Sequence, residues 1–339
     1  MLKTYDVHAH VVPTSLLDLL AKDGGRCGVS LVEEGGRTKI AVGQEASGAP
    51  RADLVDLTAR LDTMDRTGVD VQILSACIAL TAYTLPTDQG AAWTRLFNES
   101  MAETVGGHPD RFLGLCTVPL QDGEAAAAEL RYAVQQLGMV GAQIATTVAG
   151  LELDDPVLAP FWAAAEELRC IVVIHPDQVL PGREQARYVL GNFVGNAAET
   201  TIAAAHLVFG GVLERHPDLR VVLVHGGGYA PYQAGRMDHG YQSEPRLKDK
   251  RLTRLPSDYL RLLYFDTVTH SPDVMRFLLD FAGPGHVVLG SDYPFEMGEE
   301  DPVGAIQRVP GLSAADQEQI VKGNLARLVA EVRHEGEST

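Results

Sequence analysis

The stretch IVVIH at residues 171–175 decides the fold of this chain, because it is apolar at every position until it ends in a histidine. The run VVLVH at residues 221–225 has the same form. Strands that are apolar along their whole length are buried on both faces, which is typical of a parallel sheet covered by helices. Six further short β-rich runs complete the pattern, at residues 4–8, 69–75, 112–118, 140–145, 262–266 and 286–291.

Segments with helical patterns separate most of these runs. Residues 53–67 carry leucine and methionine at helical spacing, and residues 196–213 also indicate a helix. Residues 123–137 are rich in alanine and precede Gly138, a residue type that often ends helices. Eight strands with crossovers predict an α/β fold of the (β/α)8 TIM-barrel type, which needs about 250 residues plus insertions. An open doubly wound sheet is the alternative, but no GxGxxG motif follows the first strand.

The chain reads as one unit. Residues 14–50 contain no barrel strand and are rich in glycine and charge, so they predict a small insertion after strand 1, in the form of a hairpin subdomain. No internal repeat, low-complexity tract or interdomain linker is visible in the sequence. We therefore expect a single domain over residues 1–339 with the insertion inside it.

Composition restricts the function. The 339 residues include 28 Lys and Arg against 45 Asp and Glu, a net charge of −17, which disfavours binding to nucleic acid or to an anionic membrane surface. No apolar run approaches the roughly 20 residues of a membrane span, and the N-terminus lacks a secretory signal pattern. The four cysteines are widely spaced and form no CxxC pair. These features predict a cytoplasmic protein, which would need a local positive centre to bind an anion.

Polar residues stand where the predicted strands end. His8 and His10 end the first strand, His175 the fifth and His225 the sixth, and Asp292 follows the eighth. In a (β/α)8 barrel these ends meet at one mouth, where active sites are built. Two imidazoles on the same side of one strand, a third from across the barrel and a carboxylate suit Zn²⁺ or a similar ion. A packing or capping role is the alternative for each residue taken singly, but all of them coincide at strand ends.

The pattern of these strand-end residues resembles that of the amidohydrolase superfamily. The local motifs HGGG at 225–228, GRMDHG at 235–240 and LGSDYPF at 289–295 are similar to its 2-amino-3-carboxymuconate-6-semialdehyde decarboxylase branch. That branch includes metal-dependent, non-oxidative decarboxylases of hydroxybenzoates. The resemblance spans the chain from Asp6 to the C-terminal helix after Ser313.

The resemblance implies a role for each strand-end residue. His8, His10, His175 and Asp292 would bind the metal, and His225 would be the catalytic acid/base beside a metal-bound water. Binuclear members of the superfamily bridge two metals with a carboxylated lysine from the fourth strand, whereas residues 140–145 contain no lysine. We therefore expect one Zn²⁺ per chain, with Mn²⁺ or another divalent ion as the alternative.

The resemblance also implies how a small carboxylate substrate would be held. Arg236 would reach into the neighbouring subunit's site, so a homodimer is expected, and Phe295 would cover the substrate. Arg51 is the first candidate for the family's N-terminal substrate arginine, with Arg37 as the alternative. The tryptophans of the aromatic decarboxylases are replaced here, for example by Asp177 after the strand-five His-Pro pair. The substrate is therefore expected to be similar to aminocarboxymuconate semialdehyde rather than that compound itself.

Three functions are compatible with these residues and with the resemblance. The favoured one is a carboxy-lyase that acts on a small unsaturated or aromatic carboxylic acid. The alternative is a metal-dependent hydrolase or hydratase of the same superfamily that acts on a lactone, amide or activated alkene. A non-enzymatic metal-binding scaffold is disfavoured, because a strained polar site costs stability. Asp266 closes strand seven at the same mouth and would orient a ligand or serve structure alone, and His270 follows it.

Overall fold

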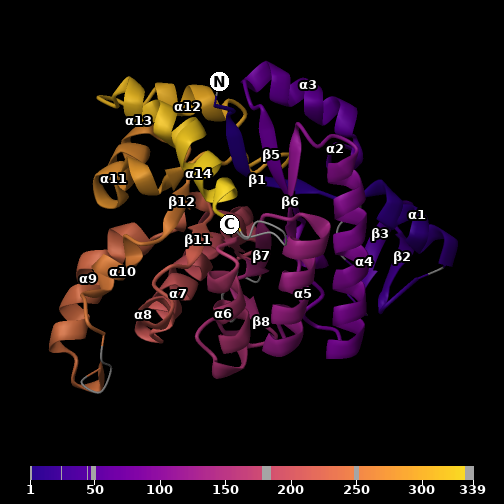
Figure 1. The fold of residues 1–339 in the computed structure, drawn as a ribbon, viewed down its shortest axis with the longest axis horizontal. Coiled ribbons are helices and arrows are strands. Elements are labelled where there is room, and N and C mark those ends of the chain that lie inside the picture. The colour runs from indigo at the N-terminus through magenta and orange to yellow at the C-terminus, as the bar shows by residue number, and fades with distance from the viewer. Residues whose placement is uncertain are drawn as a thin grey trace, which may run out of the picture.

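Eight parallel strands pair in chain order in one sheet. The sheet curves into a nearly closed barrel at the centre of the molecule (Figure 1). The computed structural model describes residues 2–23, 25–43, 45–46, 51–177, 185–247 and 252–332. Around the barrel the strands are β1 Tyr5–Val11, β5 Val71–Ala76, β6 Phe112–Cys116, β7 Gly141–Ala145, β10 Ile171–His175, β11 Arg220–Leu223, β12 Tyr264–Asp266 and β13 Val287–Val288. Because each strand lies beside the next one in the chain, there is no reversal of strand order. The predicted (β/α)8 barrel is confirmed, and the doubly wound sheet is excluded.

The barrel closes between its last and first strands through a short seam. The main-chain N of Val7 donates to Leu289 O at 2.9 Å, the N of Asp292 to His8 O at 2.7 Å and the N of His10 to Tyr293 O at 2.8 Å. β13 itself is shorter than the predicted 286–291 run because the backbone leaves the regular ladder and turns at Asp292, where φ is 59°. The seam therefore joins the two segments that carry His8, His10 and Asp292.

Helices cover the outside of the barrel. They are α1 Thr14–Asp23, α2 Ala52–Val55, α3 Leu57–Thr67, α4 Thr87–Gly106, α5 Gly123–Leu137, α6 Ala159–Glu167, α7 Asn196–Phe209, α8 Val212–Arg215, α9 Ala230–Ser243, α10 Pro256–Leu260, α11 Pro272–Ala282, α12 Pro302–Gln307, α13 Ala314–Glu318 and α14 Asn324–Ala330. In the described part of the chain, none of them combines the length and the apolar character that a membrane span requires.

Local chemistry explains where these helices begin and end. Asp122 caps α5 by accepting hydrogen bonds from the N–H groups of Glu124 and Ala125, and Gly138 ends it with a φ of 70°. The predicted helix at 53–67 is interrupted at Asp56, whose side chain caps α3 and separates it from α2. The predicted helix at 196–213 is likewise divided into α7 and α8, at Gly211, where φ is 73°.

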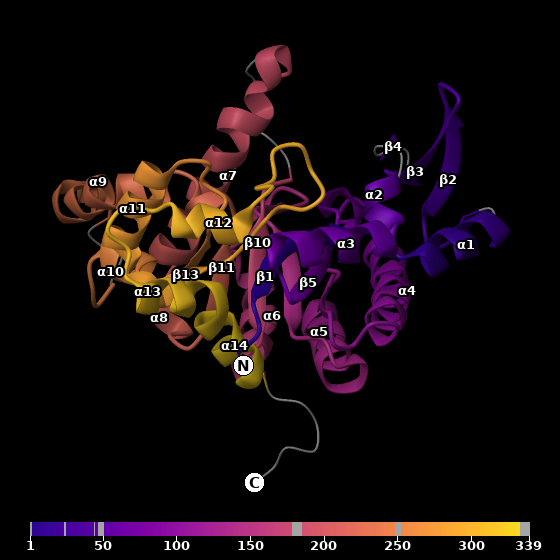
Figure 2. The ribbon, with the colours of Figure 1, turned by 90° about the horizontal axis from the view of Figure 1, so that it is seen from above.

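The predicted insertion contains α1 and a small antiparallel sheet. Its strands are β2 Val29–Glu34, β3 Arg37–Val42 and β4 Glu45–Ala46, and β2 with β3 forms a hairpin. Gly24, Gln44 and residues 47–50 of the insertion lie outside the described residues. Figures 1 and 2 place this unit at one end of the molecule, with α9 and α10 at the other. Another short hairpin, of β8 Thr147–Val148 and β9 Leu151–Glu152, follows β7.

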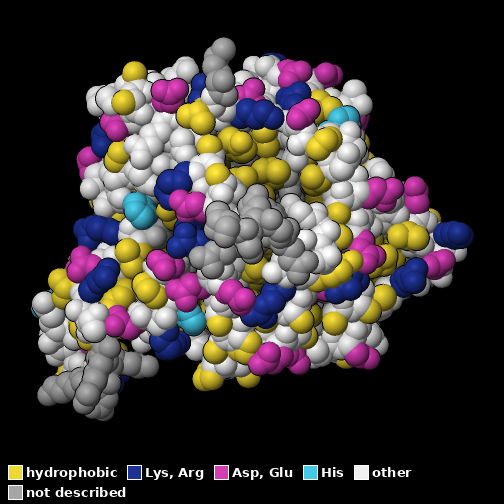
Figure 3. Space-filling view, in the orientation of Figure 1, with side chains coloured by type: hydrophobic (Ala, Val, Ile, Leu, Met, Phe, Trp, Pro, Cys, Tyr) yellow, Lys and Arg dark blue, Asp and Glu magenta, His cyan; other side chains and the backbone are white. Residues whose placement is uncertain are grey.

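The two sides of the barrel differ. The start of β1 and α14 lie on one side, and the helical stretch at the beginning of α7 projects from the other (Figure 2). On the face seen in Figure 3, acidic and basic side chains are interspersed and no large patch of one sign is present. The negative net charge is therefore not concentrated on that face.

The glycines of the HGGG segment are needed for packing. A short 3-10 turn, η5 His225–Gly227, follows β11, and residues 226, 227 and 228 all have positive φ. A Cβ atom on Gly227 would lie 2.5 Å from the Phe265 ring, and one on Gly228 would lie 2.1 Å from Ala197 O. The turn thus packs closely against Phe265 and Ala197, and there is no room for a side chain at residues 227 and 228.

We expect the change Gly227→Ala to destabilise the protein by about 2–4 kcal/mol, because it combines backbone strain with overpacking against Phe265. Chemical denaturation gives the free energy of unfolding. Gly240→Ala is the matched control, since a Cβ at that helical position meets nothing within 4 Å. Equal stability of both variants would contradict the packing role.

Candidate metal centre

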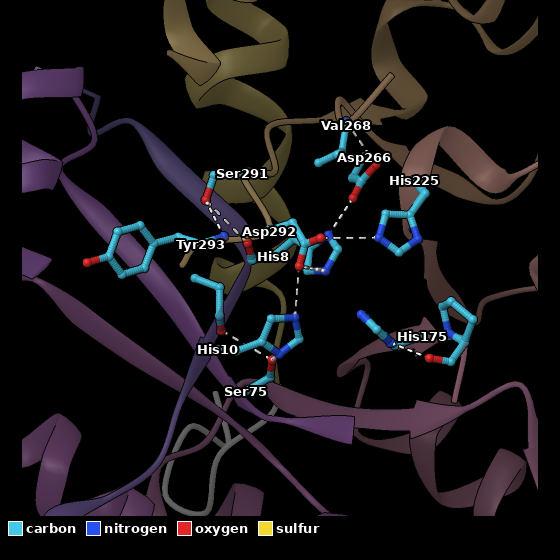
Figure 4. Close-up of polar contacts among 12 residues, drawn as sticks. His8, His10, Ser75, His175, His225, Asp266, Val268, Ser291, Asp292 and Tyr293 are labelled. Atoms are coloured by element: carbon cyan, nitrogen blue, oxygen red, sulfur yellow. Dashed lines mark hydrogen bonds and ion pairs between the residues drawn. The ribbon is translucent and has the colours of Figure 1, made fainter. Parts of the chain in front are cut away.

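Four side chains from three parts of the barrel converge at the mouth. His8 and His10 project from β1, His175 ends β10, and Asp292 follows β13 across the seam. One ligand atom from each lies within 4.8 Å of all the others, and all four residues are buried (Figure 4). The structure therefore brings together the four residues expected to bind a metal.

The atoms that face one another lie close together but make no hydrogen bonds within the described residues. His8 Nε2 and His10 Nε2 lie 3.2 and 3.3 Å from Asp292 Oδ1, yet none of these three buried atoms makes a hydrogen bond with the described residues. Leaving such groups unpaired in a protein interior is costly. Three imidazole nitrogens and a carboxylate oxygen are a donor set that suits Zn²⁺ and related divalent ions. The residues present thus fit a metal ion.

The opposite ring nitrogens are all held. His8 Nδ1 lies 2.7 Å from Asp266 Oδ2, His10 Nδ1 lies 3.0 Å from Ala76 O, and His175 Nδ1 lies 2.7 Å from Pro176 O. Such contacts fix the tautomer and the orientation of a metal-binding imidazole, so that Nε2 faces the ion. From the sequence, Asp266 would either orient a ligand or serve structure alone. In the structure its carboxylate orients the ring of His8.

The electrostatics of the group favour positive charge at its centre. Burial alone would lower the pKa of His8, but the carboxylates of Asp292 and Asp266 outweigh this effect and raise the pKa of His8 to about 10. Burial lowers the pKa of His10, and Asp292 opposes this effect only in part. Burial also lowers the pKa of His175, and the neighbouring imidazoles lower it further. Burial would raise the pKa of Asp292, but the surrounding imidazoles keep it well below its usual value. Asp292 is therefore ionised and attracts a cation.

His225 lies beside the four donors but outside their group. Its ring centroid is 5.2 Å from that of His8 and 5.4 Å from that of His175, and its Nε2 is 3.4 Å from Asp292 Oδ2. The residue stands after β11 in the left-handed region, with φ 54°, rather than at the end of the strand as predicted. Such strain in a non-glycine residue often marks a functional position.

Two of the residues expected to bind substrate adjoin the same site. The Phe295 ring centroid is 5.3 Å from that of His10, and the Arg51 guanidinium carbon is 5.9 Å from the Phe295 ring. Arg51 also forms ion pairs with Asp53 at 2.7 Å and with Glu296 at 2.5 Å. An aromatic ring and a cationic side chain thus lie beside the group of four candidate donors.

Other residues singled out in the sequence lie elsewhere. Arg236 is exposed on α9 and forms no ion pair within the described ranges. Arg37 is exposed at the start of β3, opposite Glu34 in the register of the hairpin. His270 lines a separate cavity of about 120 Å³ with Arg308. A single copy of the chain therefore does not place these three residues among the donors.

The sequence analysis missed several polar residues behind the donors. Asp6, Arg60 and Gln72 are buried and hydrogen-bonded to one another or to the donor segments. The alternation Asp6-Val7-His8 is a local signal for the first, since a carboxylate is unusual in a buried strand. Arg60 and Gln72 carry no such signal, because their partners are distant in sequence.

Comparisons with known proteins find relatives that match most of the chain. The family model described as Amidohydrolase matches residues 5–330. The 2-amino-3-carboxymuconate-6-semialdehyde decarboxylase of Dictyostelium discoideum is 32% identical over 320 residues, which cover 94% of this chain and 89% of that protein. A solved 5-carboxyvanillate decarboxylase from Sphingomonas paucimobilis superposes with a TM-score of 0.81 at 26% identity and covers 98% of this chain and 100% of its own.

A more distant solved structure shares the fold. The dihydroxybenzoic acid decarboxylase of a Polaromonas species, which contains bound manganese and the inhibitor 2-nitroresorcinol, superposes with a TM-score of 0.79 at 23% identity. The superposition covers 100% of both chains. This chain therefore shares its overall fold with a protein whose solved structure contains manganese.

Proposed function

The chain belongs to the amidohydrolase family, and we propose that it is a metal-dependent, non-oxidative carboxy-lyase that acts on a small unsaturated or aromatic carboxylic acid. The observation that carries the proposal is the buried group of His8, His10, His175 and Asp292 with His225 beside it. The decarboxylases named among the relatives and structural neighbours support this reaction over a hydrolysis.

The proposed reaction needs a proton donor beside the metal group, and His225 is our candidate. Non-oxidative decarboxylation breaks the bond between a carbon and its carboxylate, releases CO₂ and leaves a proton on that carbon. When bound, the metal supplies a positive charge that polarises a substrate oxygen near the reacting carbon. His225 Nδ1 is buried and has no partner among the described residues, while Nε2 lies near Asp292. An imidazole can act as a general acid, so His225 can bring the proton to the substrate carbon.

Phe295 and Arg51 are proposed to hold the substrate. Phe295 offers an apolar face to an unsaturated or aromatic ring beside His10. Arg51 has its guanidinium engaged by Asp53 and Glu296, but the side chain of Glu296 is 78% exposed. Exposed ion pairs contribute only about 0.2–1 kcal/mol, so a substrate carboxylate can replace Glu296 at small cost. This exchange supplies the local positive charge that an acidic protein needs.

We propose Zn²⁺ as the resident ion, one per chain, with Mn²⁺ as the alternative. Three nitrogen donors favour zinc. The manganese in the Polaromonas neighbour supports a second possibility for this fold. On β7 the buried Gln143 donates to Ala76 O at 2.8 Å, and the strand has no lysine to bridge a second ion. The cytoplasmic location is retained as a proposal from the sequence.

A homodimer is proposed as the working form. Among the described residues, twelve large apolar side chains are exposed, and eight of them lie in three segments: the stretch that leads into α7, the HGGG turn with the start of α9, and α11. Contacts connect the segments, since Tyr229 Oη donates to Val194 O at 3.4 Å and the Tyr232 and Phe277 rings are 6.3 Å apart. Such a concentration of apolar surface supports a contact with another protein surface. Its members are Tyr188, Val189, Phe193, Val194, Tyr229, Tyr232, Val274 and Phe277.

If Arg236 acts in the neighbouring subunit, two inactive variants will complement each other. Arg236→Ala and His225→Asn homodimers are each expected to lose most activity. Heterodimers purified with two different tags should regain up to about half of the activity of the wild-type dimer. One of their two sites has both residues intact, and the other carries both changes. Arg246→Ala, which removes another exposed arginine, is the control and should behave as wild type. Absence of rescue in demonstrated heterodimers would contradict sharing of the site.

The experiment that tests the proposed function is a substrate screen with two readouts. Zinc-loaded protein is incubated with carboxylated muconate semialdehydes and hydroxybenzoates, and CO₂ release is measured. Lactones and amides are screened in parallel for hydrolysis, and activated alkenes for hydration. CO₂ release supports the carboxy-lyase. Hydrolysis or hydration without CO₂ release would replace it with the alternative function, which the same metal group could serve.

A further inference from the structure

A chain of buried polar side chains lies behind the metal donors, between α3 and the barrel seam. Arg60 of α3 donates through Nη1 to Gln72 Oε1 at 3.1 Å, and Gln72 Nε2 donates to Asp6 Oδ2 at 3.0 Å. The three side chains are 0%, 3% and 0% exposed, respectively. We call Asp6, Gln72 and Arg60 the seam network.

One end of the seam network holds the main chain on both sides of the seam. Asp6 Oδ1 accepts hydrogen bonds from the main-chain N of His8 and from that of Ser291, each at 3.0 Å. Asp6 Oδ2 accepts a further bond from Ser291 Oγ at 2.6 Å. Ser291 directly precedes Asp292, so a single carboxylate ties the strand of two histidine donors to the segment of the carboxylate donor.

The other end holds the remaining donor of β1. Arg60 Nη2 donates to His10 O at 2.5 Å. The same guanidinium lies 4.6 Å from the centre of the Tyr293 ring, which follows Asp292 and, in Figure 4, points away from the donors. Burial lowers the pKa of Arg60 to about 10, so the guanidinium remains charged at neutral pH.

We propose that Asp6, Gln72 and Arg60 are positioning residues for the metal centre: they fix the backbone that carries His8, His10 and Asp292. The inference rests on the proposed metal site and adds to it three residues that touch no substrate.

The cost of the network supports a role beyond closing the barrel. A fully buried arginine and carboxylate are expensive to desolvate, and apolar residues of similar size often stabilise a core as well or better. Here the charges do not contact each other directly but reach one another through an amide. The other hydrogen bonds of these side chains go to His8, His10 and Ser291, which are proposed metal donors or directly precede one. Buried networks of this kind select one arrangement of the groups they bond.

The test compares metal binding with folding in three variants. Arg60→Met and Gln72→Met remove the two ends of the Arg60–Gln72 bond, and Arg66→Met is the matched control, because Arg66 is exposed on the same helix. For each full-length protein, the Zn²⁺ dissociation constant is measured by competition with a chelator. The melting temperature is measured without metal and with one fixed, subsaturating Zn²⁺ concentration that is the same for every protein.

A positioning role predicts that both network variants bind Zn²⁺ about 10- to 100-fold more weakly, the usual effect of losing an outer partner of a metal ligand. The rise in melting temperature on adding a fixed, subsaturating Zn²⁺ concentration should shrink accordingly, while Arg66→Met matches wild type. If the variants melt lower with an unchanged dissociation constant, the network serves folding alone and the inference is wrong. Should Arg60→Met fail to fold, Gln72→Met decides, since it keeps both charged groups. If wild type itself binds no divalent ion, the proposed function fails instead.

Discussion

Replacement of His225 by asparagine is expected to lower kcat by about 10²- to 10⁴-fold, the usual contribution of a general acid or base, and to leave the metal in place. The reason is geometric. His225 adjoins the donors but is not one of the four whose ligand atoms converge. Asparagine is the suitable replacement because residue 225 has φ 54°, a conformation that asparagine tolerates. The measurements are CO₂ release at saturating substrate and metal content by mass spectrometry.

The control for this change is His239→Asn, which alters an exposed histidine of α9 and should retain full activity. A His225→Asn protein with one metal per chain and nearly normal turnover would remove His225 from the mechanism. Loss of metal from the variant would instead place His225 among the ligands. Either result would require a different assignment of the proton donor.

The change Asp292→Asn is expected to weaken metal binding by at least about 100-fold, since loss of even an outer partner of a ligand costs 10- to 100-fold. Asp292 is the only carboxylate of the four donors, and its Oδ1 faces both His8 Nε2 and His10 Nε2. The amide keeps the shape and tolerates the φ of 59° at this position. Chelator competition gives the dissociation constant, and CO₂ release should fall in proportion to the metal lost.

Asp273→Asn is the matched control, because Asp273 is an exposed aspartate on α11 and lies outside the donor group. Its metal affinity should equal that of wild type. If Asp292→Asn binds Zn²⁺ as tightly as wild type, the carboxylate is not a ligand. The three imidazoles would then have to hold the ion without it.

The barrel could be predicted because its signal is local. Continuous apolar runs mark buried strands, and the run at 171–175 coincides with β10 at both ends. The ends of other strands depend on contacts that the sequence does not display. β11 stops at Leu223 because the HGGG turn that follows packs against Phe265. β13 is short because the residues after it leave the ladder and bond to β1 at the seam.

The donor group could be anticipated for a related reason. A parallel barrel brings the ends of all its strands to one mouth, so His8, His175 and Asp292 are neighbours once the strands are counted. The seam network could not be found this way. Arg60 has the sequence context of an exposed helical arginine, and only the packing of α3 against the seam buries it. The role of Arg236 stays a prediction, because it requires the proposed second copy of the chain.

The most direct test of the account is a titration of metal-free protein with Zn²⁺ while CO₂ release from an accepted substrate is followed. We predict that activity is absent without metal, rises in proportion to added Zn²⁺ and reaches its plateau at one ion per chain. The same plateau with Mn²⁺ would change the identity of the ion and not the mechanism. CO₂ release that is independent of metal, or a plateau at two ions per chain, would contradict the assignment of a single-metal decarboxylase.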